Sequence, residues 1–137
     1  MQRLDLQKSN MSPNFIGSWM INQPSLCDGL IDYFESHQDK HKKGLTGAGL
    51  DLDTKNSTDI HMIPNDINLA GNEVFNEYFK NLFDCHKDYL LQWPFLGGFA
   101  KNLEIGRFNL QRYQSGQHFQ RLHTERSNLA SLHRVLA

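Results

Sequence analysis

Cysteine is scarce in this chain, and so are the long apolar runs that mark membrane proteins. The two cysteines, Cys27 and Cys85, fall in helix-like segments, so we expect free, buried thiols rather than a disulfide framework. No apolar run approaches the roughly 20 residues that a membrane helix needs. The amino terminus has acidic and amide residues where a secretory signal would have an apolar stretch. We therefore expect a cytoplasmic protein in a reducing compartment, with no membrane partner.

Net charge is almost absent as well. Fourteen Lys and Arg against fifteen Asp and Glu give a net charge of -1 at pH 7. No global field then attracts the protein to nucleic acid, and we expect no nucleic-acid partner. Aromatic side chains, in contrast, are plentiful: nine Phe, four Tyr and two Trp among 137 residues. These can fill the core of one domain, so the sequence predicts a folded chain rather than a disordered one.

Two stretches have the apolar period of amphipathic helices. Residues 25–38 follow Pro24, and a segment rich in His and Lys follows them, in which we expect Gly44 to form a left-handed helix cap. Residues 74–90 form the longest pattern, with aromatic and aliphatic side chains repeating every 3.6 residues until Trp93-Pro94 interrupts it. Core packing explains these aromatic residues fully, so we assign them no chemistry.

Short strands are expected at residues 14–21, 58–63, 105–113 and 132–137. The glycine-containing loop 44–56 lacks the Lys-Ser/Thr of a phosphate-binding loop, so we expect only a connection there. From residue 105 the period changes to two, which gives the strand one polar face rich in hydrogen-bond donors. The pattern predicts an α+β fold in which residues 1–104 are a helical support region with short strands and residues 105–137 are the first core strands. Residues 132–137 read as though the single domain were truncated within a strand.

Charge and candidate chemistry concentrate near the carboxyl end. Residues 107–137 contain five arginines and one acidic residue, Glu125, which gives this segment a charge of +4. Glu125 follows His123 by two positions, and in an extended segment side chains at i and i+2 lie on the same face. An imidazole and a carboxylate placed in this way can occupy two neighbouring positions of a divalent metal, as in the facial triad of non-haem Fe(II) oxygenases.

The segment from Asn109 to Arg126, NLQRYQSGQHFQRLHTER, resembles the Tyr-x-x-Gly…His-x-Asp/Glu signature of prolyl 4-hydroxylase-like dioxygenases that depend on 2-oxoglutarate and Fe(II). The likeness continues weakly upstream, where a helix, the Lys-x-Ser-Thr-Asp segment of residues 55–59 and a long helix precede the signature. The resemblance implies an incomplete double-stranded β-helix, or jelly roll, with two supporting amphipathic helices. It also implies that His123 and Glu125 bind Fe(II) and that Tyr113 and Gln111 bind 2-oxoglutarate.

The implied reaction consumes O2 and 2-oxoglutarate as small-molecule cosubstrates and hydroxylates a C–H bond. The implied substrate is a peptide, with peptidyl proline first, or a small molecule, and ascorbate is a further candidate cofactor. The chain departs from the family pattern in two ways. Glutamate replaces the commoner aspartate, and Phe119 and His123 are one residue further apart than in many relatives. We assign no general acid, base or nucleophile.

The family places a second histidine and a basic 2-oxoglutarate clamp several tens of residues after the first motif, whereas this chain ends twelve residues after Glu125. His118 is a poor substitute, so we expect the 137 residues alone to be inactive. The main alternative is a non-catalytic jelly-roll binding module in which His123 and Glu125 are structural. A zinc hydrolase is disfavoured because the sequence lacks His-Glu-x-x-His and paired cysteine ligands.

Overall fold

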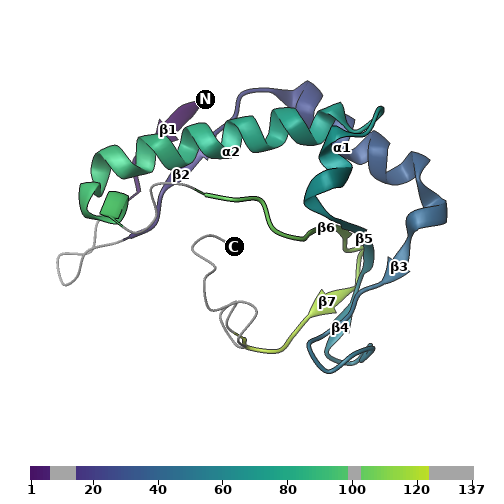
Figure 1. The fold of residues 1–137 in the computed structure, drawn as a ribbon. Helices are drawn as coiled ribbons and strands as arrows, with labels where there is room; N and C mark the ends of the chain where they lie inside the picture. The colour runs from purple at the N-terminus through teal and green to yellow at the C-terminus, as the bar shows by residue number, and fades with distance from the viewer. Residues whose placement is uncertain (7–14, 99–102, 124–137) are drawn as a thin grey trace. The chain divides into compact units, whose positions relative to one another are not determined.

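The computed structural model of the chain describes residues 1–6, 15–98 and 103–123 (Figure 1). These residues form an α+β fold with two α-helices and small antiparallel sheets, as the sequence predicts. The chain forms two compact units. Unit 1 comprises Met1–Tyr33 and Asn65–Glu104, and unit 2 comprises Phe34–Pro64 together with the described residues from Ile105 onward. Residues 34–64 thus belong to the same unit as the strands after residue 104, and the predicted division of the chain at that residue stays a prediction.

Helix α2, Glu73–Gln92, is the main element of unit 1 and confirms the longest helical pattern. It ends before Trp93-Pro94 because a residue that precedes proline is driven out of the helical conformation. The 3-10 helices η2, Pro64–Asn68, and η3, Pro94–Gly98, flank α2 in the sequence. Only Phe75 and His86 are buried on α2; its other apolar side chains are half-buried or exposed.

A two-stranded ribbon accompanies α2 in unit 1 (Figure 1). Strands β1, Gln2–Leu4, and β2, Ser18–Met20, pair antiparallel. The indole Nε1 of Trp19 donates to the Asp88 carboxylate of α2 at 2.7 Å, and Arg3 forms an ion pair with Asp88 at 3.0 Å. The strand predicted at residues 14–21 is thus confirmed for its second half, but its partner β1 was not anticipated because residues 2–4 lack a strand-like pattern.

Helix α1, Pro24–Ser36, confirms the first predicted helix. Near the end of α1, the carbonyl of Phe34 accepts a hydrogen bond from His41 Nε2 at 2.9 Å. The 3-10 helix η1, Gln38–Lys40, intervenes. The prediction that Gly44 caps this helix in a left-handed conformation is wrong, because Gly44 has no positive φ and its N–H instead donates to Ser57 of the sheet at 3.0 Å.

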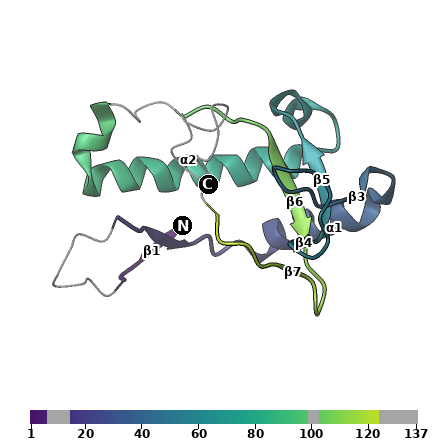
Figure 2. The same cartoon turned by 90° about the horizontal axis from the view of Figure 1, so that it is seen from below.

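The sheets of unit 2 are formed by five short strands. Strands β3, β5 and β6 make a three-stranded antiparallel sheet in that order, and β4 pairs with β7 (Figure 2). Their bounds are Lys42–Lys43 for β3, Lys55–Asn56 for β4, Thr58–Met62 for β5, Phe108–Arg112 for β6 and His118–Phe119 for β7. The loop predicted at residues 44–56 therefore ends in a strand, and the strand predicted from residue 105 starts at Phe108.

The register of β5 and β6 gives their sheet two different faces. Ile60 and Met62 are buried and lie opposite Leu110 and Phe108, which forms the apolar face. The polar face contains Asp59 opposite Gln111 and His61 opposite Asn109. The alternation predicted along residues 105–113 is confirmed for Phe108–Arg112. The described residues contain neither a closed sheet nor a jelly roll, and the strand predicted at residues 132–137 lies outside them.

The cysteines are free, as expected, but they are not both buried. Cys27 is exposed on α1, although its neighbour Leu26 is buried. Successive residues of a helix point about 100° apart, so Leu26 and Cys27 need not share a face. The expectation of a buried thiol at Cys27 is therefore wrong, whereas Cys85 on α2 is half-buried.

Candidate functional site

A network of polar side chains in unit 2 centres on Asp59 of β5; Lys55, Ser57 and Asp59 are buried, whereas Gln111 is exposed. The Asp59 carboxylate is fully buried and accepts three hydrogen bonds from side chains. The Lys55 ammonium donates at 3.0 Å, the Ser57 hydroxyl at 2.7 Å and the Gln111 amide at 2.8 Å. A buried carboxylate is stable only when it is paired and hydrogen-bonded, and these three donors meet both needs. We call these four residues the Asp59 network.

Local sequence explains how the Asp59 network assembles. Lys55, Ser57 and Asp59 alternate along an extended segment, and residues two apart in such a segment project to the same side. Gln111 joins them because β6 places it directly opposite Asp59. The Lys55 side chain is 6% exposed, and removing one partner of such a buried pair costs about 3–5 kcal/mol of stability.

Gly44 is the point at which β3 approaches the Asp59 network. A Cβ atom at this position would lie 2.0 Å from the Ser57 hydroxyl oxygen, 2.8 Å from Lys55 Cε and 3.3 Å from an Asp59 carboxylate oxygen. The first two distances are shorter than real Cβ contacts, and the third is at the tight end of their range. The missing side chain of Gly44 therefore lets the backbone pack against the network, and this close approach explains the glycine better than a helix cap does.

The β4–β7 pair connects the Asp59 network to the segment that precedes the His-x-Glu motif. Lys55 lies opposite Phe119 in this pair, with its ammonium 5.7 Å from the centre of the Phe119 ring. That distance is within the range of a cation–π interaction. The Phe119 ring in turn stacks on the His123 imidazole, with 4.3 Å between ring centroids and 24° between planes. Three side chains thus form a continuous series of contacts that ends at a predicted metal ligand.

One hydrogen bond of His123 indicates which of its ring nitrogens donates. Its Nδ1 lies 2.9 Å from the Arg121 carbonyl oxygen, and since a carbonyl can only accept, Nδ1 carries the proton. In the neutral ring the lone pair is then on Nε2. Metal-binding histidines commonly have this arrangement, with one ring nitrogen donating to a backbone carbonyl and the other coordinating. The predicted partner Glu125 lies outside the described residues.

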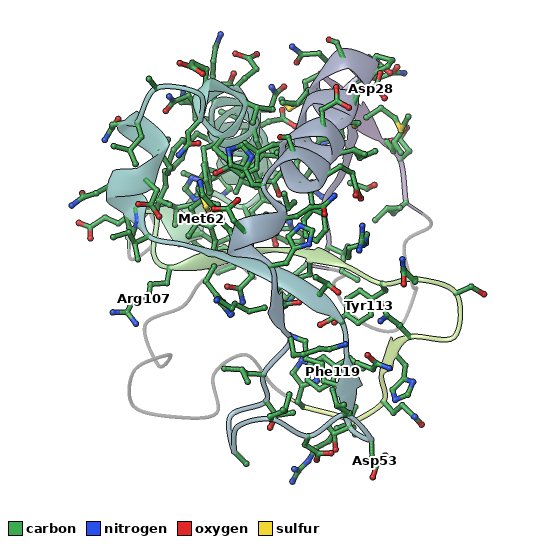
Figure 3. All side chains as sticks on the ribbon, turned by 90° about the vertical axis from the view of Figure 1, so that its right-hand side faces the viewer. Asp28, Asp53, Met62, Arg107, Tyr113 and Phe119 are labelled. Carbon is green, nitrogen blue, oxygen red and sulfur yellow. The ribbon has the colours of Figure 1, made fainter. Side chains whose placement is uncertain are left out.

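The predicted 2-oxoglutarate residues lie at the carboxyl end of β6. Tyr113 directly follows the strand and is 41% exposed, while Arg107 lies at the strand's opposite end (Figure 3). The Gln111 amide belongs to the Asp59 network through one of its N–H groups, and an amide has a second donor and an acceptor oxygen. His118, the histidine nearest to the motif in sequence, lies with its Nε2 3.1 Å from the Asp53 carbonyl oxygen, to which it donates.

A short turn leads from the loop into β4. The Asp51 carboxylate accepts from the backbone N–H groups of Asp53 and Thr54 at 3.2 and 3.1 Å. Hydrogen bonds from Thr54, and then from Asp53, hold the pKa of Asp51 below its ordinary value, and the positive charge of Arg121 adds to this effect. The ionised form of Asp51 therefore stabilises the start of β4.

The described residues contain no group of three or more His, Cys, Asp or Glu side chains that could hold a metal ion. Within the same part of the chain, none of the helices has the length and hydropathy that a membrane crossing requires. In comparisons with known proteins, the chain matches no family model, no curated protein and no solved structure.

Sequence reasoning did not identify the Asp59 network as a site. A signal was present, because Lys55, Ser57 and Asp59 form an alternating polar series that leads directly into the apolar part of β5. An ionised residue at a position where a strand is buried needs a partner. The sequence alone does not say that the partners are Lys55 and Gln111, which are 4 and 52 positions away.

Proposed function

We propose that this chain carries part of a 2-oxoglutarate- and Fe(II)-dependent dioxygenase site of the prolyl 4-hydroxylase-like kind. In this proposal His123 and Glu125 are two protein ligands of the metal, and Tyr113 and Gln111 orient the cosubstrate. The jelly-roll core to which residues 105–137 would contribute is part of the proposal. A third protein ligand and a basic clamp for 2-oxoglutarate are assigned to none of the 137 residues.

The observation that carries the proposal is the 2.9 Å contact between His123 Nδ1 and the Arg121 carbonyl oxygen. This hydrogen bond leaves the lone pair on Nε2, which suits metal binding, and Glu125 follows at the spacing of the motif. A histidine and a carboxylate are also the donor set of non-haem iron sites. His123 and Glu125 are therefore of the residue types that Fe(II) accepts as ligands.

The chemistry that becomes available when Fe(II) is bound is the decarboxylation of 2-oxoglutarate to succinate and CO2, coupled to hydroxylation of a C–H bond by O2. The side chains of this chain position the cosubstrate. The phenol of Tyr113 would donate a hydrogen bond to a carboxylate of 2-oxoglutarate. Gln111, fixed by Asp59 through one N–H, would use its second N–H in the same way. Peptidyl proline is the first candidate substrate because the family resemblance indicates it.

A non-catalytic binding module is the second candidate function. It is favoured by the same contacts of His123, because stacking on Phe119 and a hydrogen bond to a carbonyl are also what a structural histidine makes. In this alternative His123 has no metal, and its replacement would alter local packing alone.

The test uses the protein with any residues that its gene encodes after Ala137. We expect His123→Ala to abolish Fe(II)-dependent succinate formation. We also expect this variant to lose affinity for Co(II), used as a probe of the metal site. The matched control is His61→Ala, which removes an exposed histidine of the same unit whose Nδ1 lies 2.8 Å from Asn109. Unchanged succinate formation by the His123 variant would reject the proposal and favour the binding module.

A second variant tests the cosubstrate residue. Tyr113→Phe removes one hydrogen bond to a charged group, worth about 1.5–3 kcal/mol. We expect the concentration of 2-oxoglutarate at half-maximal rate to rise by roughly tenfold or more, with a smaller change in kcat. An unchanged 2-oxoglutarate requirement would remove Tyr113 from the site.

A further inference from the structure

A series of four side chains runs from the sheet of unit 2 to His123. Asp59 binds the Lys55 ammonium at 3.0 Å, Lys55 lies over the Phe119 ring at 5.7 Å, and the Phe119 ring stacks on His123 at 4.3 Å. The buried end of this series is rigid, because Lys55 and Asp59 are both enclosed by protein. The other end is exposed.

The position of Phe119 relative to Lys55 is set by several backbone and side-chain contacts. The two residues are directly opposite in the β4–β7 pair. The Gln117 amide donates to the Asn56 side-chain oxygen at 3.2 Å, and the Gln120 N–H donates to the Thr54 carbonyl at 3.0 Å. Figure 3 shows Phe119 near Asp53, whose carbonyl oxygen accepts a hydrogen bond from His118, the neighbour of Phe119 in β7. Lys55 is the cation that this ring faces.

After Phe119, the Gln120 N–H still donates to the Thr54 carbonyl, but residues 121–123 belong to no strand in the part of the chain that the structure describes. β7 ends at Phe119, and residues 120–123 are exposed. In such a segment the direction of a side chain depends on side-chain contacts more than on a backbone ladder. The stacked Phe119 ring therefore restricts the orientation of the His123 imidazole, and the hydrogen bond to Arg121 fixes which of its nitrogens is protonated.

We propose that Lys55 is a positioning residue for His123: anchored by Asp59, its ammonium holds the Phe119 ring, and this ring holds the imidazole in the orientation that binds the metal. The inference rests on the proposed function, because the orientation matters only if His123 is a ligand. Asp59 is the fixed point of the series. Its carboxylate also accepts a hydrogen bond from Gln111, the proposed cosubstrate residue, so the same carboxylate contacts both the series that leads to His123 and a cosubstrate residue.

The experiment replaces the ion pair by neutral groups of similar size, Lys55→Met together with Asp59→Asn, so that no buried charge is left unpaired. The first readout is the proton NMR shift of the His123 ring, which the stacked Phe119 ring moves upfield. We expect this displacement to fall by half or more in the double variant, while the signals of the His61 ring stay in place. Lys55→Arg, which retains the cation, should keep the upfield displacement of the His123 ring signals.

The second readout is the affinity for Co(II), measured on the protein with any residues that its gene encodes after Ala137. Loss of a supporting residue around a metal ligand typically weakens binding by 10–100-fold, and we expect about tenfold for the double variant. Phe119→Leu should give a similar loss without disturbing the buried pair, which tests the contact between Phe119 and His123; if the double variant does not fold, Lys55→Met measured for the same ring shift tests the contact between Lys55 and Phe119. Lys55→Arg should stay within about twofold of the original affinity.

The outcomes separate the two proposals. If the original protein and His123→Ala bind Co(II) equally, the dioxygenase proposal fails, and the ring shift alone decides whether Lys55 positions His123. If the original protein binds Co(II) through His123 but the folded double variant keeps both the ring shift and the affinity, the positioning role is wrong while the proposed function stands. Unchanged affinity in Phe119→Leu also overturns the positioning role.

Discussion

At the scale of single residues, Gly44 shows how the absence of an atom can be a structural requirement. Its place beside Ser57, Lys55 and Asp59 leaves no room for a Cβ. The sequence suggested a helix cap because glycine often follows a helix. The tertiary structure uses the same glycine for a different reason, the close approach of β3 to a buried ionic network.

Gly44→Ala is therefore expected to destabilise the protein by about 1–3 kcal/mol, the usual cost of overfilling a packed region. The measurement is the free energy of unfolding in urea. Gly47→Ala is the matched control, since a Cβ at Gly47 meets nothing within 4 Å and that residue has no positive φ. Equal stability of the two variants would show that Gly44 is not packed as described.

The two cysteines also differ at this scale. Burial raises the pKa of the Cys85 thiol, and the negative charges of Asp88 and Asp84 raise it further. The reactive species is the thiolate, so a raised pKa moves the onset of reaction to higher pH.

We expect Cys85 to react with iodoacetamide several-fold more slowly at pH 8 than the exposed Cys27, with a rate that continues to rise above the pH at which an ordinary thiol has ionised. Rates measured on the single-cysteine variants Cys27→Ser and Cys85→Ser check this. Equal rates, or a faster Cys85, would contradict the described environment of α2.

At the scale of elements, helices were predicted more accurately than strands. The pattern over residues 74–90 identified α2 nearly to its ends, because a helix bonds to itself and its apolar period is local. The strands β1, β3, β4 and β7 were not anticipated, since each has only two or three residues and exists because a partner from elsewhere in the chain pairs with it.

The turn at residues 51–54 offers a pH test at this scale. The pKa of Asp51 is lowered in the folded protein, so its ionised form adds stability that is present above the ordinary carboxyl pKa and is lost as the pH falls through the lowered value. We expect the backbone amide signals of Asp53 and Thr54 to shift together in NMR, with a midpoint below the ordinary Asp pKa of about 3.9. Asp51→Ala should abolish this transition. A midpoint at or above the ordinary value would contradict the hydrogen bonds.

At the scale of the whole molecule, the balance of charge argues against a nucleic-acid partner. Five arginines in residues 107–137 form a locally positive segment, but the chain as a whole has a net charge of -1. One of these arginines, Arg112, is already paired with Glu35 at 2.6 Å. Charge-driven binding to phosphate groups weakens steeply as the salt concentration rises, so a few local arginines in a chain of balanced charge should give little binding at physiological salt.

We therefore expect no measurable shift of a DNA or RNA duplex by the protein at 150 mM salt, at concentrations up to about 10 μM. An electrophoretic mobility assay repeated at low salt provides the comparison, since weak charge-driven contacts would show there first. Sequence-selective binding that persists at 150 mM salt would contradict this prediction.

The sequence by itself determined the α+β class, the two helices and the alternation along β6, because each depends on the order of apolar and polar residues over a short span. It also supplied the spacing of His123 and Glu125. Only the tertiary structure decided that Asp59 gathers Lys55, Ser57 and Gln111, that Gly44 must lack a side chain, and that Phe119 lies between Lys55 and His123. These contacts join residues up to 64 positions apart through strand pairing. The register of that pairing is fixed by the energy of packing distant segments together, which no local pattern contains.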